Sequence, residues 1–283
     1  MINTKLAVRP ALQSDHTAIA NLMYFEPRVH RHLDWRGPLE WLGVPEYWVL
    51  EQGDSIVSAL ACPPDPQGVA WLRFFAHVSG VSLQDAWQAL WQVALPALKE
   101  RGYLIGAITV SEWFGPLLLE SGFSITQQIV VLEHDSVEFK LRPLPSNIVM
   151  RSMTDRDLQA VAKVDQEGFA PLWRNSIQAL RSGYNQSGFA TVALLDGEIV
   201  GYQISTRNSF GVHLARLAVL PACQGREIGY SLVQDLLLQT RRAGLRRLTV
   251  NTQNDNRMSL ALYQKIGFEL TGEQYTVYTL YTE

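Results

Sequence analysis

The sequence predicts an α/β layered fold that is present in two tandem copies. Strand-like and helix-like stretches alternate along the chain, which is typical of a layered α/β sheet. After residue 147 the same order of stretches begins again. Residues also recur at one constant offset, Ile56-Val57 as Ile199-Val200 and Gly68-Val69 as Gly211-Val212. A repeat of this length indicates a duplicated domain, because solenoid repeats are only about 20–50 residues long.

Length and composition agree with this interpretation. The chain has 283 residues, 47% of them hydrophobic and 18% charged, which is enough to build the cores of two ordinary domains. The formal net charge of −3 and the lack of a basic stripe argue against nucleic acid as a partner. Cys62 and Cys223 lie far apart in the sequence and the six histidines show no ligand spacing, so we expect no metal.

The N-terminal residues contain no apolar signal core. No stretch approaches the roughly 18 consecutive apolar residues that a membrane helix requires. Two cysteines without a disulfide framework fit a reducing compartment. We therefore expect a cytoplasmic protein with no membrane partner.

The first copy is expected at residues 1–140. Ser14 and Asp15 are good N-cap residues for a helix that follows a short strand. The further expected strands are 46–50, 55–62, 70–77, 103–110 and 125–132, and the further expected helices are 85–100 and 113–120. Two prolines then interrupt the pattern at 141–147, which we interpret as a linker.

The second copy, residues 148–283, repeats this order. Asp196-Gly197 between two apolar runs is a strong signal for a hairpin turn. The expected strands are 148–151, 190–195, 199–206, 217–219, 245–252 and two closing strands around 269 and 275–281; the expected helices are 155–167, 174–184, 230–238 and 259–265.

Leu217–Leu232 is the stretch that points to a function. It begins as a strand, passes through Gly225 and Gly229, and continues as an apolar helix. The first backbone N–H groups of a helix lack partners within it, and the helix dipole adds partial positive charge, so a glycine turn there can hold a phosphate. The corresponding stretch of the first copy, His77–Asp85, has one glycine and no Lys or Arg. We therefore place the chemistry in the second copy.

Two motifs of the second copy resemble those of the GNAT superfamily of acyl-CoA-dependent N-acyltransferases. They read V-x-P-x-x-Q-G-R-x-I-G-x-x-L from Val219 and N-x-x-S-L-A-L-Y-x-K-I-G-F from Asn256. The resemblance covers residues 148–283, and the first copy resembles a degenerate version of the same domain. It implies two tandem GNAT-like domains, each with a mixed, mostly antiparallel sheet flanked by helices. It also implies acetyl-CoA as co-substrate and no metal.

The resemblance assigns roles to individual residues. Tyr263 matches the tyrosine that serves as general acid for the departing thiolate, and Asn256 matches an asparagine that contacts the CoA arm. Leu217 and Val219 match the strand that pairs with the pantetheine arm. The residues that match the pyrophosphate loop are Gln224, Gly225, Arg226, Ile228 and Gly229.

Glu227 departs from the family pattern, because it stands where the family has a glycine. A carboxylate beside a pyrophosphate is electrostatically unfavourable unless it points into solvent. We therefore expect CoA binding that is weakened but not abolished.

Acyl transfer to an amine requires a neutral amine, a stabilised oxyanion and a protonated leaving thiolate. We assign His213 as the general base, since it lies on the strand before the loop, where several family members carry a glutamate. Its ordinary pKa near 6.5 suits this role. By strict alternation, His213, Ala215, Leu217 and Val219 would share one face of the strand.

Structural interpretations of these residues stay open beside the catalytic ones. His213 could be a half-exposed strand histidine, in which case Glu167 or Glu198 is the base. Tyr263 could be a core residue without a catalytic role.

Cys223 adjoins the loop, but the sequence offers no His or basic partner to activate it, which favours direct attack over an acyl-cysteine intermediate. Trp173 and Arg174 lie between the first two helices of the second copy, where the family builds its acceptor site, and are candidate acceptor contacts.

Two functions from different classes fit these observations. The first is an acetyl-CoA-dependent N-acetyltransferase that acts on a small-molecule or peptide amine. The alternative is a non-catalytic acyl-CoA-binding or sensor protein, which Glu227 and the unsettled base favour. The sequence leaves the acceptor and the oligomeric state open.

Overall fold

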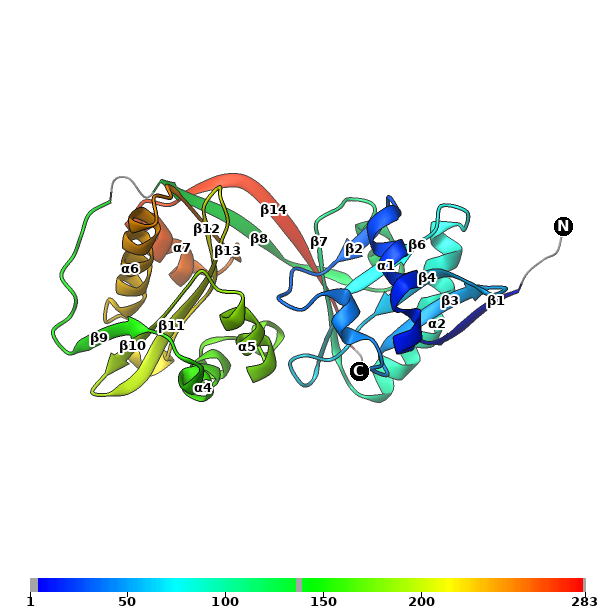
Figure 1. Cartoon of the computed structure of the whole chain (residues 1–283), viewed down its shortest axis with the longest axis horizontal. Helices are drawn as coiled ribbons and strands as arrows, with labels where there is room; N and C mark the ends of the chain where they lie inside the picture. Colours follow the sequence, from blue (N-terminus) through cyan, green and yellow to red (C-terminus); the bar gives the residue numbers. More distant parts are fainter. Residues whose placement is uncertain (1–4, 136–138, 282–283) are drawn as a thin grey trace. The chain divides into compact units, whose positions relative to one another are not determined.

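Each copy of the repeat folds around a β-sheet whose strands pair mainly with antiparallel neighbours. The computed structural model describes residues 5–135 and 139–281 (Figure 1). Contacts divide the chain into two units. Unit 1 comprises Met1–Thr126 and Thr276–Glu283, and unit 2 comprises Gln127–Tyr275.

Unit 1 contains a five-stranded sheet in the order β1-β3-β4-β6-β2. The strands of unit 1 are β1 (Leu6–Pro10), β2 (Val29–Arg31), β3 (Tyr47–Gln52), β4 (Ser55–Ala61), β5 (Val69–Trp71), β6 (Phe74–His77) and β7 (Leu104–Thr109), of which β5 and β7 lie outside this sheet. Its helices are α1 (His16–Phe25), α2 (Leu83–Glu100) and α3 (Phe114–Glu120), with short 3₁₀ turns at Gln13–Asp15 and Pro38–Trp41.

Alternate residues of β3 supply two cores on the two faces of this sheet. Trp48 and Leu50 pack with Trp87 of α2, whereas Tyr47 and Val49 pack in the cluster on the side of α1. The two-residue period of a strand accounts for this division. Helices therefore cover both faces of the sheet, as the layered fold class requires.

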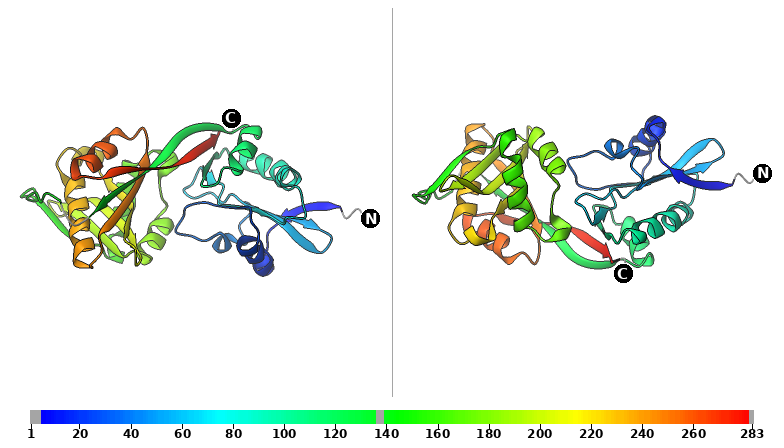
Figure 2. Two further views of the ribbon diagram at one scale, coloured as in Figure 1. Left: turned by 90° about the horizontal axis from the view of Figure 1, so that it is seen from above. Right: turned by 90° about the horizontal axis from the view of Figure 1, so that it is seen from below.

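Unit 2 repeats the order of elements. Its strands are β9 (Ile148–Ser152), β10 (Phe189–Leu195), β11 (Glu198–Arg207), β12 (Val212–Val219) and β13 (Arg247–Gln253). Its helices are α4 (Leu158–Gly168), α5 (Ile177–Asn185), α6 (Ile228–Arg242) and α7 (Arg257–Ile266), with 3₁₀ turns at Asp155–Asp157, Pro171–Trp173 and Pro221–Cys223. In Figure 2, α4 and α5 cover one face of this sheet, and α6 and α7 cover the other.

An ion pair at the same place in each copy confirms the duplication. In unit 1, Arg9 donates to both carboxylate oxygens of Asp15 at 2.7 and 3.0 Å. In unit 2, Arg151 donates to both oxygens of Asp157 at 2.7 and 2.8 Å. Both carboxylates also accept a backbone N–H from three residues earlier, at 2.7 Å. The pair joins the first strand to the start of the first helix in each copy.

A second shared feature is a short parallel pairing that ends abruptly. In unit 1, β5 pairs with β7 from Val69 to Trp71, and the chain then bends into β6. In unit 2, β12 pairs with β13 only from Val212 to Leu214. The two copies therefore share the point at which these two strands part.

Two long strands carry the chain between the units, β8 (Ser124–Asp135) and β14 (Glu269–Leu280). The 129–135 part of β8 pairs with β13 in unit 2, and the 276–280 part of β14 pairs with β7 in unit 1. By hydrogen bonding the order is β5-β7-β14-β8-β13-β12-β11-β10-β9. The stretch 141–147, expected as a linker, consequently lies inside unit 2. Where two closing strands were expected there is one, β14.

In the part of the chain that the structure describes, no helix combines the length and the apolar character needed to cross a membrane.

Candidate active site

The central feature of unit 2 is a gap in the sheet between β12 and β13. Their pairing ends at Leu214 and Val250, although β12 continues to Val219 and β13 to Gln253. Along its other edge, β12 stays paired with β11 as far as Val219. Beyond Leu214, β12 is no longer paired with β13, so backbone groups on this side can bind another chain or a ligand, except the Val219 carbonyl, which accepts from Gln224 Nε2. Leu217 and Val219, the residues expected to pair with a pantetheine arm, lie on this stretch.

A β-bulge at Ala215 changes which side chains of β12 share a face. Leu214 is opposite Ser205 and Arg216 is opposite Ile204, so Ala215 is an extra residue on β12. The expectation that His213 and Leu217 share a face is therefore wrong, because it assumed strict alternation. His213 instead shares its face with Arg216.

The packing partners agree with this assignment of faces. Leu214 packs with Val233 of α6, and Leu217 lies against the same core. On the other face, Arg216 forms an ion pair with Asp165 of α4. His213 therefore lies on the α4 side of the gap.

The loop before α6 has the backbone that the glycine motif requires. Gly225 has a φ of 76°, and a Cβ at this position would meet no atom within 4 Å, so the loop is open there. A Cβ on Gly229 would lie 3.3 Å from Leu262 Cδ2, which leaves little room for a side chain. Ile228, the first residue of α6, is buried and anchors the helix start in the core.

The N-termini of α2 and α6 differ in their capping. In the first copy, Ser82 Oγ accepts a hydrogen bond from the backbone N–H of Asp85 and so caps α2. In the second copy, no side chain caps α6, whose N-cap residue is Glu227. The first N–H groups of α6 are thus available to an external acceptor, as a phosphate-binding helix requires.

Glu227 is in the left-handed region, with φ 60° and ψ 9°. This explains why the family places a glycine here, since a Cβ is disfavoured in this conformation. Its carboxylate accepts hydrogen bonds from Lys265 Nζ at 2.7 Å and from Arg142 at 3.3 Å, and these interactions lower the pKa of Glu227. The carboxylate is therefore neutralised by two cations.

The remaining loop residues are exposed. Gln224 donates from Nε2 to the carbonyl oxygen of Val219 at 3.1 Å, which closes the loop on the end of β12. Arg226 is exposed beside it. A cation in this position can contribute to holding a phosphate.

Asn256 and Tyr263 occupy the first and second turns of α7. Asn256 is the N-cap residue, and its Oδ1 accepts from the backbone N–H of Ser259 at 3.1 Å. Tyr263 is 3% exposed and packs in the same cluster as Leu214 and Val250, the last strand pair before the gap. Burial raises the pKa of its phenol, so the hydroxyl keeps its proton. Tyr263 and His213 thus lie on opposite faces of the sheet.

His213 is half-buried beside the last strand pair. Its Nδ1 lies 2.9 Å from Thr249 Oγ1 on β13. Burial lowers the pKa of His213, which keeps the imidazole neutral around pH 7. A neutral imidazole is the form that can accept a proton from an amine.

Two residues not selected from the sequence organise the α4 side of the gap. Arg216 donates to both oxygens of buried Asp165 at 2.7 and 2.9 Å, and its guanidinium carbon lies 3.5 Å from the ring centroid of Phe169. Tyr202 Oη also donates to Asp165. The sequence contains a signal for Arg216, because Arg73 precedes it by the same offset that relates Ile56 to Ile199.

This buried ion pair holds the turn between α4 and α5. Asp165 Oδ1 accepts from the backbone N–H of Asn175 at 2.7 Å, and Arg216 donates to the carbonyl oxygen of Trp173. The indole N–H of Trp173 donates to Gln127 Oε1 at 3.1 Å, and Arg174 donates to the carbonyl of Phe169. Both candidate acceptor contacts therefore have structural partners.

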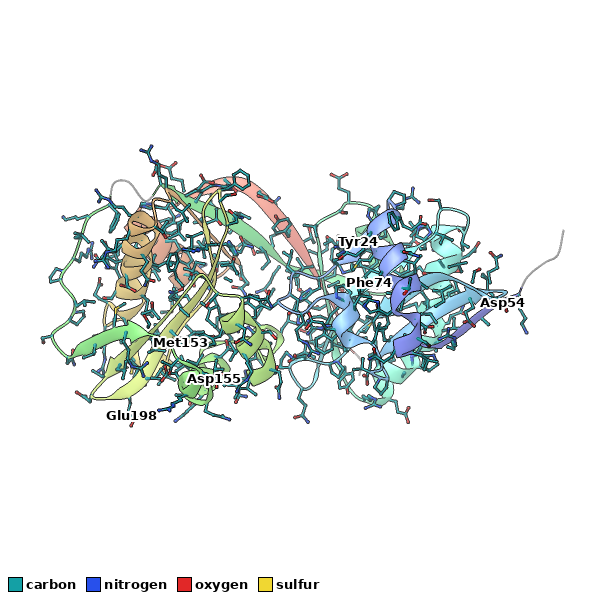
Figure 3. All side chains as sticks on the ribbon, viewed as in Figure 1. Tyr24, Asp54, Phe74, Met153, Asp155 and Glu198 are labelled. Carbon is teal, nitrogen blue, oxygen red and sulfur yellow. The ribbon has the colours of Figure 1, made fainter. Side chains whose placement is uncertain are left out.

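Of the alternative catalytic groups, Glu198 lies far from the gap. Glu198 is at the tip of the β10–β11 hairpin (Figure 3). Thr206, which pairs with His213, is eight residues further along β11, about 26 Å at 3.3 Å per residue. Glu167 is exposed on α4, and Cys223 is buried behind the loop.

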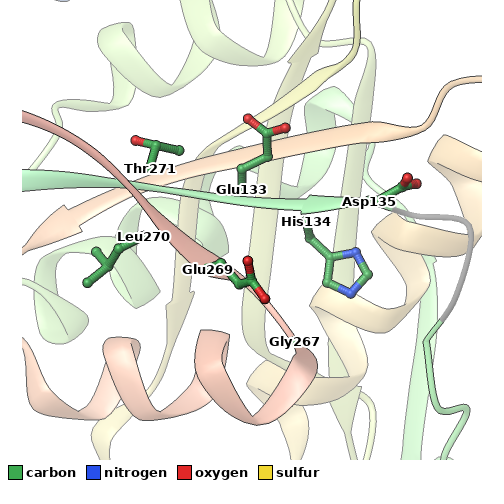
Figure 4. Close-up of a pocket in the computed structure, with 7 residues that line it drawn as sticks. All are labelled: Glu133, His134, Asp135, Gly267, Glu269, Leu270 and Thr271. Carbon is green, nitrogen blue, oxygen red and sulfur yellow. The ribbon is translucent and has the colours of Figure 1, made fainter.

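A separate open pocket of about 790 Å³ lies where β8 and β14 approach the end of α7 (Figure 4). It is lined by Glu133, His134, Asp135, Gly267, Glu269, Leu270 and Thr271. It contains none of the residues expected in the active site. Across the described residues, no group of three or more His, Cys, Asp or Glu side chains could hold a metal ion.

Comparison with known proteins agrees with this geometry. Residues 156–268 match the acetyltransferase (GNAT) family. The chain is 31% identical over 90 residues to an uncharacterised N-acetyltransferase of Methanocaldococcus jannaschii, covering 31% of this chain and 56% of that protein. It is 26% identical over 170 residues to the mycothiol acetyltransferase of Saccharomonospora viridis, covering 52% of this chain and 55% of that protein. The chain thus spans about half the length of each.

Among solved structures, a tandem GNAT protein from the clavulanic acid biosynthesis pathway superposes with a TM-score of 0.60 at 16% identity and covers 99% of both chains. At this identity the likeness concerns the fold alone. The fold class predicted from the sequence is confirmed. Residues 156–268 therefore match a GNAT acetyltransferase domain, and over its whole length the chain has the fold of the solved tandem GNAT protein.

Proposed function

We propose that this chain transfers an acetyl group from acetyl-CoA to a primary amine of a small-molecule or peptide acceptor, by direct attack of the amine on the thioester. The observation that carries the proposal is the combination of two features of one strand–helix unit. The pairing gap after Leu214 leaves β12 free for the pantetheine arm, and the uncapped start of α6 follows directly. The pantetheine arm fits along the free edge of β12, and the diphosphate attached to it fits at the start of α6.

The residues present are suited to this group. The N–H groups of Ile228 and Gly229 are in the first turn of α6, where they can donate to pyrophosphate oxygens. Gly225 leaves open space on the same loop, and Arg226 adds a positive charge. Leu217 and Val219 would pair with the amide groups of the arm. Asn256, which caps α7, would contact the arm from the other side.

His213 and Tyr263 would then handle protons from opposite sides of the gap. Nε2 of His213 takes a proton from the attacking amine, directly or through one water. The amine nitrogen forms a bond to the carbonyl carbon, and the carbon–sulfur bond breaks. Tyr263 gives its proton to the departing sulfur. Burial raises the pKa of this phenol, so Tyr263 carries the proton before the reaction begins.

The acceptor is proposed only at the level of chemistry. Among the relatives, one is named as a mycothiol acetyltransferase, but the chain overlaps only about half of that protein. On the α4 side of the gap, the carboxylate of Asp165 is fully buried and neutralised by Arg216. The turn at Trp173 borders this side, and we propose that it contacts the acceptor.

Thiol release from acetyl-CoA with a panel of primary amines tests the proposal, with the melting temperature measured with and without acetyl-CoA. We expect acetyl-CoA to raise the melting temperature, because a ligand that binds only the folded state stabilises it. We also expect at least one amine to release thiol above the rate without amine. A thermal shift without amine-dependent release would support the non-catalytic acyl-CoA-binding alternative, and the absence of both would contradict each function.

A further inference from the structure

His213 has a hydrogen-bonding partner, Thr249, that lies outside both sequence motifs of the second copy. Thr249 is directly opposite His213 in the parallel register of β12 and β13, and the two side chains share the α4 face of the sheet. Nδ1 of His213 and Oγ1 of Thr249 are 2.9 Å apart. The next pair along the strands, Leu214 and Val250, is the last before the gap. Thr249 therefore contacts His213 immediately beside the gap.

The second neighbour of Thr249 indicates the direction of this hydrogen bond. Oγ1 of Thr249 also lies 3.5 Å from the carbonyl oxygen of Val212, which can only accept. When the single hydroxyl proton of Thr249 points to that carbonyl, Oγ1 can only accept from His213. Nδ1 then carries the proton, and Nε2 keeps its lone pair.

The charges that face this pair are already matched with partners. Along its other edge β13 pairs with β8, where Glu133 is opposite Thr249. Glu133 forms an ion pair with Arg247 at 2.8 Å. On β12, Arg216 is paired with Asp165 of α4. Each pair sums to no net charge, so neither sign dominates at the imidazole. A neutral hydroxyl partner supports the neutral imidazole, whereas a carboxylate partner would favour its protonated form.

We propose that Thr249 is the positioning residue for His213: it accepts the Nδ1 proton, fixes the ring orientation, and so leaves the Nε2 lone pair available to the attacking amine. This inference rests on the proposed role of His213 as general base. Thr249 itself touches neither the amine nor the thioester. Its effect on the reaction is exerted through the tautomer of the imidazole.

The test compares Thr249→Val, which has nearly the same shape without the hydroxyl, with Thr249→Ser, which keeps the hydroxyl. The first readout is the tautomer of His213 from ¹⁵N NMR of the full chain, with the signal assigned by its loss in His213→Gln. We expect an Nδ1–H tautomer in the wild type and in Thr249→Ser. In Thr249→Val we expect the population to move to the Nε2–H tautomer, because Nδ1–H has lost its acceptor.

The second readout is kcat and KM for acetyl-CoA, with the amine of the panel that is turned over fastest. We expect Thr249→Val to lower kcat about tenfold with little change in KM, and Thr249→Ser to restore at least half of the wild-type kcat. Thr240→Val is the matched control, because Thr240 is buried in α6 of the same unit and its hydroxyl donates to the carbonyl oxygen of Leu236 in its own helix. It should change neither readout.

The outcomes separate this inference from the proposed function. An unchanged tautomer or an unchanged kcat in Thr249→Val overturns the positioning role. A wild-type kcat in His213→Gln refutes His213 as the base, and with it the catalytic consequence of Thr249. In that case the NMR measurement still decides whether Thr249 fixes the tautomer, because that readout does not depend on turnover.

Discussion

The carboxylate of Glu227 accepts a hydrogen bond from Lys265 Nζ at 2.7 Å, and this pair joins the start of α6 to the last turn of α7. It places a negative charge, with a cation beside it, at a position where the family has glycine. The backbone there remains left-handed, as a glycine would allow. The pair therefore decides how many positive charges the loop can offer to a phosphate.

Glu227→Gly should tighten acetyl-CoA binding several-fold. The change releases Lys265 and Arg142 from the carboxylate, and it removes left-handed strain that costs about 1 kcal/mol. Calorimetric titration with acetyl-CoA measures the effect. Glu227→Gln is the control, because it removes the charge but keeps a Cβ in the left-handed region. Both variants should bind more tightly at low salt, and an unchanged dissociation constant in both would contradict the electrostatic account.

Tyr263→Phe should lower kcat at least about tenfold, the lower range of a lost general acid, while acetyl-CoA affinity stays within about twofold. The phenyl ring can still fill the cluster with Leu214 and Val250. Tyr230→Phe is a matched control in the same cluster, because its hydroxyl bonds to the carbonyl of Lys140 and not to the gap. If kcat falls equally in Tyr263→Phe and Tyr230→Phe, or falls in neither, Tyr263 is not the general acid.

Lowering the pH from 7.5 to 5 should destabilise unit 1 through His30. Burial lowers the pKa of His30 to about 4, and its Nε2 lies 2.8 Å from the carbonyl oxygen of Leu72. The unfolded chain, with a histidine pKa near 6.5, then binds more protons than the folded one between about pH 6.5 and 4. Stability is therefore full above this window and falls as the pH drops through it, by about 2 kcal/mol at pH 5.

Urea unfolding followed by tryptophan fluorescence measures this effect, since every tryptophan except Trp173 is in unit 1. His30→Gln can still donate to Leu72 but does not titrate. The wild type should lose about 2 kcal/mol more than His30→Gln between pH 7.5 and 5. An equal loss in both would show that other groups carry the pH dependence.

Asp157→Asn should destabilise the protein by about 2 kcal/mol, because it leaves the bonds of Arg151 and the Thr154 backbone N–H without a charged acceptor. Asp15→Asn is the matched change in unit 1. Both β8 and β14 run from one unit into the other, so we expect the two units to unfold together. Both variants should therefore shift the tryptophan fluorescence transition. A shift in Asp15→Asn alone would mean that unit 1 unfolds independently.

The sequence predicted most elements and their repetition because these depend on local signals, but the single strand expected at 70–77 is two strands, β5 and β6, in different sheets. The Arg9–Asp15 and Arg151–Asp157 spacing is short, and the structure pairs both. The loop at Gly225 and the Asn256 cap of α7 also follow from neighbouring residues. The left-handed backbone of Glu227 could be suspected from the glycine in the family pattern. Its hydrogen bonds to Lys265 and Arg142 could not be predicted, because both residues are distant in the sequence.

Features that depend on distant pairing were not predictable. The bulge at Ala215 inverts the faces of β12, and nothing in the alternation of apolar residues there marks it. The pairing of β8 with β13, and of β14 with β7, depends on which sheet a strand joins, which a repeat of two similar copies leaves open. The contact of His213 with Thr249 also requires the register of a parallel pair.

The decisive measurement is a crystal structure of the wild-type chain with acetyl-CoA. We expect the pyrophosphate on the backbone N–H groups of the 225–229 loop and the pantetheine arm along Leu217–Val219. The thioester should lie in the gap beyond Leu214, between His213 and Tyr263. Acetyl-CoA bound at the Ser82-capped start of α2, or elsewhere than the gap between β12 and β13, would contradict this expectation.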